Sequence, residues 1–313
     1  MTEFLQQVIN GLSLGAVYAL LALGYTMVYG ILRFINFAHC DVFMVGAFVG
    51  YYAVTPFTIR VAKIGLSLPV NLHIGTDSIA GGTLALLLAV AFCAVLGIII
   101  ERLAYRPLRQ CSKLTVLITA IGVSLFLENM GQLVFGADPK PFPELFPVRE
   151  FSLGAINVSS NQLLVMGVSA LLVIGLQFIV KRTKMGTAMR AVSLNPVAAS
   201  LVGINNDRVI SFTFGLGSAL AAAGGILYAL NYPAINPYMG ILPGLKAFVA
   251  AVLGGIGNIR GAALGGVLLG LVETFVNGSH YSTYKDAIAF AVLILILLFR
   301  PAGLLGKVET EKI

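Results

Sequence analysis

The chain has 313 residues, of which 58% are hydrophobic and only 11% are charged, and its formal net charge is +7. A soluble domain carries roughly 45–50% apolar and about 25% charged residues, so this chain has too little polar surface to cover a water-soluble sphere. These proportions exclude an ordinary cytosolic enzyme, a disordered protein and a DNA-binding domain. They predict an all-α polytopic membrane protein with a single transmembrane domain over residues 1–313.

Apolar segments recur along the whole chain, and a helix that crosses a bilayer needs about 20 such residues. We expect about 8–9 transmembrane helices, because two of the segments are Gly-rich and are typical of broken or reentrant helices. The segments, in chain order, are about 5–29, 37–57, 79–100, 114–136, 161–180, 209–231, 243–257, 261–276 and 287–299.

Glycine is abundant, with 35 residues, and small residues recur at four-residue spacing. Pairs such as Gly11 with Gly15, and Gly266 with Gly270, let helix backbones approach closely inside a membrane. The segment 254–266 has glycines around an Asn and an Arg, which predicts a turn between two short helices. No segment of the sequence has the G-x-x-x-x-G-K-[ST] pattern of a nucleotide-binding loop.

Two loops, 101–113 and 181–208, carry most of the basic residues. Lys and Arg concentrate in cytoplasmic loops, and two spans separate these loops, so we expect both in the cytoplasm. The intervening loop 137–160 is then outside. The C-terminal tail, with Lys307 and Lys312, is inside.

The side of the N-terminus depends on the second apolar segment. It lies outside if 37–57 is a full span and inside if that segment is reentrant, and Arg33 favours the first arrangement. A cleaved signal peptide is not expected, because Glu3 rather than a basic residue precedes the first apolar run.

The segment 181–208 is too long for a simple turn and contains the signals of a short helix. Asn195 can cap a helix, Pro196 suits its first position, and Gly203 suits the position after its end. A short apolar helix on this side either packs against the protein's own spans or docks in a groove of a partner. Its apolar face, at i, i+3 and i+4 spacing, consists of Ala198, Leu201 and Val202.

This segment resembles the coupling loop of permeases in ABC importers for branched-chain amino acids. The residues that carry the resemblance are Met189-Arg190-Ala191, Asn195-Pro196, Ala198-Ala199 and Gly203-Ile204. Three further blocks agree, and they are INFAHCDVFMVGA at 35–47, KAFVAAVLGGIGNIRGAALGG at 246–266, and YKD at 284–286. The LivH type of permease fits better than its usual partner, the LivM type, chiefly because of the INFAH segment.

The resemblance implies a type II-like ABC importer permease in the bacterial inner membrane, with a cytoplasmic C-terminus. It implies a LivM-type second permease, two cytoplasmic ATPases that hold ATP and Mg, and a periplasmic substrate-binding protein. This chain is then not an enzyme, holds no cofactor or metal, and contacts membrane lipid but no nucleic acid. The residues expected to couple it to the ATPase are Arg190, Ala191, Asn195, Pro196, Ala198, Ala199, Leu201, Gly203 and Ile204.

Cys40 departs from the family pattern, which usually has Gly at this position. Cys is small enough to preserve close packing. A backbone with positive φ at this position would be strained by any side chain, so the role of the turn depends on its conformation.

Ionisable side chains inside apolar segments are costly and often functional. His39 and Asp41 start the second segment, where an interfacial position competes with a functional one. Glu128 and Asn129 interrupt the fourth span and can face the pathway or a partner permease, whereas the long stem of Lys246 can extend to a membrane interface. The pathway candidates are Asn36, His39, Asp41, Glu128, Asn129 and Lys246, and Glu273 is a further ionisable group near a span end.

A stand-alone ion-coupled secondary transporter or a channel is the competing function, since broken Gly-rich helices suit it as well. A membrane enzyme is disfavoured, because the three histidines at 39, 73 and 280 do not cluster in the sequence. Within the importer interpretation, urea or a short amide is an alternative substrate, because the binding protein usually selects the cargo.

Overall fold

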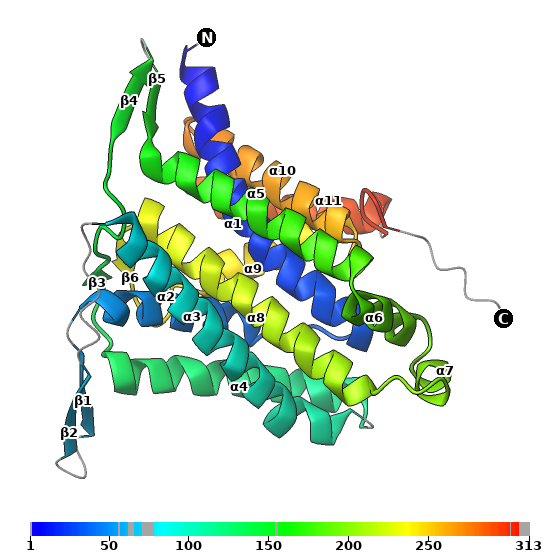
Figure 1. The fold of residues 1–313 in the computed structure, drawn as a ribbon. Helices are drawn as coiled ribbons and strands as arrows, with labels where there is room; N and C mark the ends of the chain where they lie inside the picture. The colour runs from blue at the N-terminus through cyan, green and yellow to red at the C-terminus, as the bar shows by residue number, and fades with distance from the viewer. Residues whose placement is uncertain are drawn as a thin grey trace.

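The structure is a computed structural model that describes residues 2–55, 57–61, 66–70, 78–109, 111–153, 156–300 and 302–306. Its helices form a bundle, with strands at one end and short helices at the other (Figure 1). Seven of the described helices, two of them lengthened by adjoining turns, are long and apolar enough to cross a membrane. They are α1 (Thr2–Leu32), α3 (Ile79–Ile100), α4 (Lys113–Phe135), α5 (Ser160–Arg182), α8 (Asn206–Asn231), α10 (Ile259–Asn277) and α11 (Lys285–Phe299).

Two shorter apolar helices, α2 (His39–Val54) and α9 (Ile241–Gly254), complete the transmembrane part. All nine predicted segments therefore form helices, which confirms the all-α polytopic fold. The remaining helical elements are η1 (Glu101–Tyr105), η2 (Arg106–Leu108), α6 (Lys184–Leu194), α7 (Pro196–Leu201) and η3 (Ser282–Tyr284).

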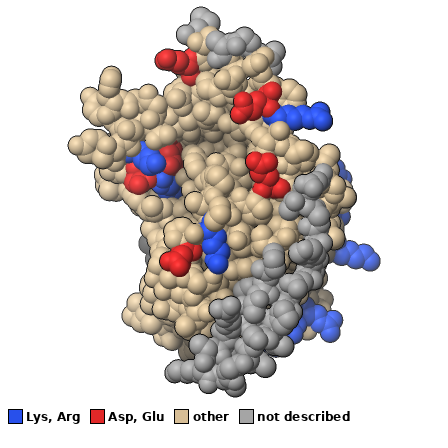
Figure 2. Space-filling model, turned by 90° about the vertical axis from the view of Figure 1, so that its left-hand side faces the viewer, with Lys and Arg blue, Asp and Glu red and all other residues tan. Residues whose placement is uncertain are grey.

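Three short antiparallel strand pairs, which the hydropathy pattern does not predict, lie at the end of the bundle opposite α6 and α7 (Figure 1). Acidic and basic side chains both occur on this side, spread among uncharged residues (Figure 2). The pairs are β1 (Phe57–Val61) with β2 (Leu66–Val70), β3 (Lys140–Pro141) with β6 (Ala234–Ile235), and β4 (Glu150–Leu153) with β5 (Ile156–Ser159).

Helices α1 and α8 occupy the interior of the bundle, whereas α4, α5 and α11 are mostly exposed. Helix α1 packs against α10 through the glycine pairs that the sequence singles out. A Cβ atom on Gly15 would lie 2.7 Å from the Cα of Val267, and one on Gly266 would lie 2.5 Å from the Cα of Ala19. The two backbones therefore touch directly, as small residues allow in a membrane.

The start of α1 lies beside the start of α5. Gln6 Nε2 donates to the Asn157 carbonyl at 2.9 Å, and the Asn157 N–H donates to Gln6 Oε1 at 3.0 Å. Asn157 belongs to β5, which leads directly into α5, and α5 crosses the bundle before the segment 181–208 begins. The N-terminal end of α1 is therefore on the opposite side of the membrane from 181–208, as expected if the second segment carries the chain across.

The turn between α9 and α10 forms where the sequence predicts it. Gly255 and Gly257 have φ values of +102° and +92°, which only glycine adopts without strain. Asn258 then caps α10, accepting from the Arg260 N–H at 3.1 Å.

The described end of the chain packs onto this turn. The Leu304 N–H donates to the Leu253 carbonyl at 2.8 Å, and the Leu305 N–H donates to that of Gly254 at 3.1 Å. The tail residues Lys307 and Lys312, expected in the cytoplasm, lie outside the described residues.

We predict that Gly15→Ala destabilises the protein, because the added methyl group meets the α10 backbone rather than a flexible side chain. Overpacking of this kind costs about 1–3 kcal/mol. Thermal unfolding of the purified protein in detergent measures the loss. Gly167→Ala on α5 is the matched control, because a Cβ there meets no atom within 4 Å. Equal midpoints for the two variants would show that the α1–α10 contact can relax.

Candidate functional site

A break between α1 and α2 brings three of the predicted pathway residues into the interior. Of the described residues other than glycine, Arg33 alone has a positive φ, of 55°, and it turns the chain after α1. Asn36, His39 and Asp41 are 5%, 2% and 1% exposed. The His39 ring packs against Gly24 of α1, with no room for a Cβ there. These polar groups therefore lie inside the bundle rather than at its surface.

Cys40 sits in the helical backbone of α2, so the strain that a positive φ would impose does not arise. Its Sγ lies 2.6 Å from the Tyr25 hydroxyl oxygen. Gly240 and Gly244, at the start of α9, pack directly against it, and a Cβ on Gly244 would lie 2.6 Å from the Cys40 Cβ. The missing side chains of two glycines thus provide the space that the thiol fills.

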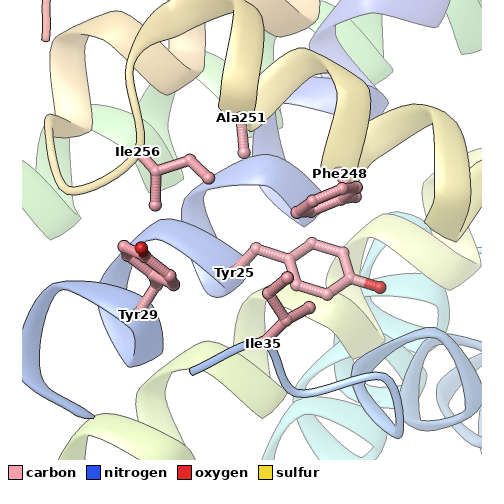
Figure 3. A pocket seen from close by; sticks show the side chains of 6 residues that line it. All are labelled: Tyr25, Tyr29, Ile35, Phe248, Ala251 and Ile256. Atoms are coloured by element: carbon pink, nitrogen blue, oxygen red, sulfur yellow. The ribbon is translucent and has the colours of Figure 1, made fainter. Parts of the chain in front are cut away.

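A small cavity lies beside this break, between α1 and the loop end of α9 (Figure 3). Its volume of about 10 Å³ is just enough to hold one water molecule. The cavity is therefore too small for an amino-acid side chain. The residues that line the cavity are Tyr25, Tyr29, Ile35, Phe248, Ala251 and Ile256.

A stripe of polar side chains runs along α4 at four-residue spacing, and we call Ser124, Glu128 and Gln132 the α4 stripe. The Ser124 hydroxyl donates to the Asp41 carboxylate of α2. Gln132 donates to the hydroxyl of Tyr238, in the segment before α9. Glu128, between them, is half-buried on a helix whose other faces are largely exposed and apolar. The stripe therefore links α4 to α2 through Asp41 and to the segment before α9 through Tyr238.

Asn129, the neighbour of Glu128, is exposed, and its amide donates back to the Leu125 carbonyl of α4 at 2.7 Å. It therefore lies at the edge of the stripe and bonds within its own helix. Glu128 and Asn129, which are neighbours in the sequence, therefore have different surroundings.

Lys246 does not extend to a membrane interface, and that expectation is wrong. Its side chain is 5% exposed, and its Nζ lies 2.6 Å from both Glu273 Oε1 and Asp286 Oδ1. The Tyr18 hydroxyl donates to the other Glu273 oxygen at 2.8 Å. These four residues, the Lys246 cluster, join α1, α9, α10 and α11, because a buried charge is tolerated only when it is paired.

The predicted helix in 181–208 is α7, and its caps are as expected. Asn195 Oδ1 accepts from the N–H groups of Val197 and Ala198, each at 3.0 Å. Gly203, just after the helix, has a φ of +87°. The short helix therefore has a defined start and end.

The apolar face of α7 points away from the protein. Leu201 and Val202 are 82% and 77% exposed, and Ala198 is exposed beside them. Ala199 is buried on the opposite face, and its carbonyl accepts from the Ile204 N–H at 3.0 Å, which closes the C-terminal end of the helix. We call Val197, Ala198, Leu201 and Val202, together with the exposed Leu194 of α6, the α7 surface.

The preceding helix, α6, is not predicted from the sequence. Thr183 caps it, accepting from the Gly186 N–H at 3.0 Å. Arg190 donates back to the Val180 carbonyl and to Thr187, while Ala191 is half-buried. Arg190 is itself exposed, so it both fixes the start of the segment and contributes to its surface, whereas Ala191 contributes less to that surface.

A charged network at the same end of the bundle is also absent from the sequence-based prediction. Arg109 pairs with both Glu101 and Asp207, and Arg106 also pairs with Asp207. The available signal is Glu101 at the start of the basic loop, eight positions before Arg109, and nothing local identifies Asp207, which lies 98 positions beyond Arg109.

A helical membrane bundle with broken helices, an internal polar stripe and an apolar helix exposed at its basic end has the features of a transport permease. The profile of the family described as "Branched-chain amino acid transport system / permease component" matches residues 7–297. The chain belongs to this family.

Similar proteins match over nearly their whole length. The high-affinity branched-chain amino acid transport system permease protein BraD of Pseudomonas aeruginosa is 44% identical, over 99% of this chain and 98% of its own. LivH of Escherichia coli strain K12, named for the same transport system, is 42% identical over the same shares. A probable branched-chain amino acid permease of Methanocaldococcus jannaschii is 31% identical, over 92% of this chain and 88% of its own.

We predict that Lys246→Met strongly destabilises the protein, because it leaves the buried Glu273 carboxylate without its cation. Breaking a buried pair in this way costs about 3–5 kcal/mol. The double variant Lys246→Met with Glu273→Met removes both charges and should recover much of the loss. Thermal unfolding in detergent compares the two. A single variant as stable as the unsubstituted protein would show that the cluster does not hold the four helices together.

Proposed function

We propose that this chain is the permease subunit of an ATP-driven importer of branched-chain amino acids in a bacterial inner membrane. Similarity over nearly the full length to permeases of branched-chain amino acid systems supports the substrate class. The partners would be a second permease of the LivM type, two cytoplasmic ATPases and a periplasmic substrate-binding protein. ATP and Mg would bind to the ATPases.

The observation that carries the proposal is the α7 surface. Five apolar or small side chains lie exposed on a segment that extends beyond the spans. A contiguous apolar patch outside the bilayer marks a site of protein–protein contact. We infer that the α7 surface docks into a groove of the ATPase and moves when the ATPases close.

Charge supports the orientation. The loops 101–113 and 181–208 lie at the same end as α7 and are rich in Lys and Arg, which favours the cytoplasmic side. The start of α1 and the strands would then face the periplasm. The described end of the chain, packed on the turn after α9, would face the cytoplasm.

The complex reconstituted in proteoliposomes tests the function. We expect ATP inside the vesicles to drive uptake of leucine, isoleucine or valine when the binding protein is present outside. Leu201→Asp should reduce uptake at least about tenfold, because a carboxylate on the α7 surface resists desolvation by the ATPase.

Leu201→Met is the matched control, since it keeps an apolar side chain of similar volume, and uptake should persist. Equal uptake by the Asp and Met variants would remove the α7 surface from its proposed role. Uptake of urea or a short amide alone would correct the substrate. Uptake by the isolated chain, driven by an ion gradient, would replace the importer with a secondary transporter.

The pathway is proposed along the α4 stripe, between this chain and the second permease. A branched-chain amino acid is a zwitterion with an apolar side chain. A weakly polar surface suits its passage, because tight binding would slow its release. We propose that Glu128, half-buried on α4, meets the ammonium group, and that the exposed apolar side chains of α4 contact the hydrocarbon part of the substrate.

We predict that Glu128→Lys reduces uptake by at least about tenfold while ATP hydrolysis stimulated by the binding protein persists, because the new cation repels the ammonium group. Glu128→Gln keeps the polarity without a charge and should retain most of the uptake. Full uptake by the Lys variant would place the pathway elsewhere.

A further inference from the structure

Two sets of side-chain contacts, joined by the backbone of one helical turn, lead from the α7–α8 junction to the break between α1 and α2. It begins at Asp207, in the first turn of α8, a few residues after α7 ends. Arg109 Nη1 donates to Asp207 Oδ1 at 2.7 Å, and the same guanidinium also pairs with the Glu101 carboxylate. One arginine thus joins the start of α8 to the end of α3.

Glu101 is held firmly by its surroundings. It is fully buried, and its second carboxylate oxygen accepts from the Ser211 hydroxyl of α8. The folded protein would be strongly destabilised if a buried carboxylate lost its cation. We therefore expect Glu101 to move together with the groups that neutralise it. A movement at the start of α8 would therefore reach Glu101 both through Ser211 and through Arg109.

Glu101 starts a π-helical turn, η1, rather than an ordinary continuation of α3. The Arg106 N–H bonds to the Glu101 carbonyl, five residues back. A π turn contains one more residue per turn than the regular helix. If the turn changes to α geometry, the register shifts by one residue and the side chains rotate by about 100°. Such a change would give the turn a second arrangement, distinct from the π turn of this structure.

Tyr105 ends the π turn and contacts the helix break. It is fully buried, with the rings of Phe34 and Phe214 each at a centroid distance of 5.3 Å. Its hydroxyl donates to Asn36 Oδ1 at 2.6 Å. Asn36 lies in the break, three residues before His39. A rotation of Tyr105 therefore acts directly on the segment that carries the buried polar groups.

We propose that the π turn Glu101–Tyr105 transmits movement from the α7–α8 junction to the break between α1 and α2. Asp207, Arg109 and Tyr105 are positioning residues for the transport step. The inference rests on the proposed function, since the ATPases supply the movement. Besides the contact that α7 makes with the ATPase, the inference proposes a route for the movement through the end of α3.

The test measures ATP hydrolysis and leucine uptake in the same proteoliposomes. Tyr105→Phe removes the bond to Asn36, and Asp207→Asn weakens the bond to Arg109. Each should raise the ratio of ATP hydrolysed to leucine imported by about tenfold, within the usual range of coupling energies, while hydrolysis itself persists. Asp207→Glu keeps the negative charge, so its ratio of ATP hydrolysed to leucine imported should equal that of the unsubstituted protein.

Tyr18→Phe is the matched control for Tyr105→Phe. It also removes the hydroxyl of a buried tyrosine, but in the Lys246 cluster. Its ratio should stay unchanged even if its stability falls. Asp207 is 43% exposed in its side chain, so its Asn variant is expected to fold even if the Tyr105 variant does not.

A second readout follows the break itself. In a Cys93→Ala, Cys111→Ser background, Cys40 is the remaining thiol of the sequence. We expect its labelling rate by a small neutral thiol reagent to differ between the nucleotide-free and ATP-trapped complexes. Tyr105→Phe and Asp207→Asn should abolish this difference, and Tyr18→Phe should retain it.

The outcomes separate the inference from the proposed function. If the Tyr105 and Asp207 variants keep both the unsubstituted ratio and the nucleotide-dependent labelling, the route through the π turn is wrong, while uptake by the complex still supports an importer. The inference would also be overturned if the labelling rate of Cys40 were the same with and without nucleotide in the unsubstituted protein and in every variant. If the unsubstituted complex imports nothing on ATP, the proposed function fails, and the inference fails with it.

Discussion

The direct backbone contact between α1 and α10 is the constraint on which the rest of the structure depends. In lipid, helices gain little from burying apolar side chains against each other, so close van der Waals contact has to hold them together. Gly15 and Gly266 allow that contact, and α1 thereby becomes the interior helix around which the others pack. This arrangement also fixes the position of the break after α1, because the ring of His39, just after the break, packs on Gly24 of α1.

The buried ion pairs among the described residues form two clusters. The Lys246 cluster joins four helices, and Glu101 with Arg109 joins the end of α3 to α8. Each cation has an acidic partner, as burial requires. The Asp41 carboxylate, which is also buried, lies outside both clusters and accepts from the Ser124 hydroxyl. The bundle is thus held by ion pairs at two places and by a weaker polar contact between α2 and α4.

The sequence predicts local features well and long-range pairings poorly. Hydropathy locates all nine apolar helices, and the capping chemistry of Asn195 and Gly203 locates α7, because these signals lie within a few residues of each other. The partners of Lys246 are different. They lie 27 and 40 positions further along the chain, and nothing in the local pattern distinguishes a paired lysine from one that extends to an interface. The strands are not predicted from hydropathy because each has only two to five residues.

The exposure of the α4 stripe has a consequence for biosynthesis. An ionised side chain facing lipid near the middle of a bilayer costs on the order of 2.5–3.5 kcal/mol. Glu128 is only half-buried by this chain, so a chain inserted without its partner presents a carboxylate to lipid. In the proposed complex, a second permease that covers α4 would stabilise the chain by mass action. The unassembled subunit would then be a natural substrate for membrane proteases, and synthesis of the partner would set how much of this chain accumulates.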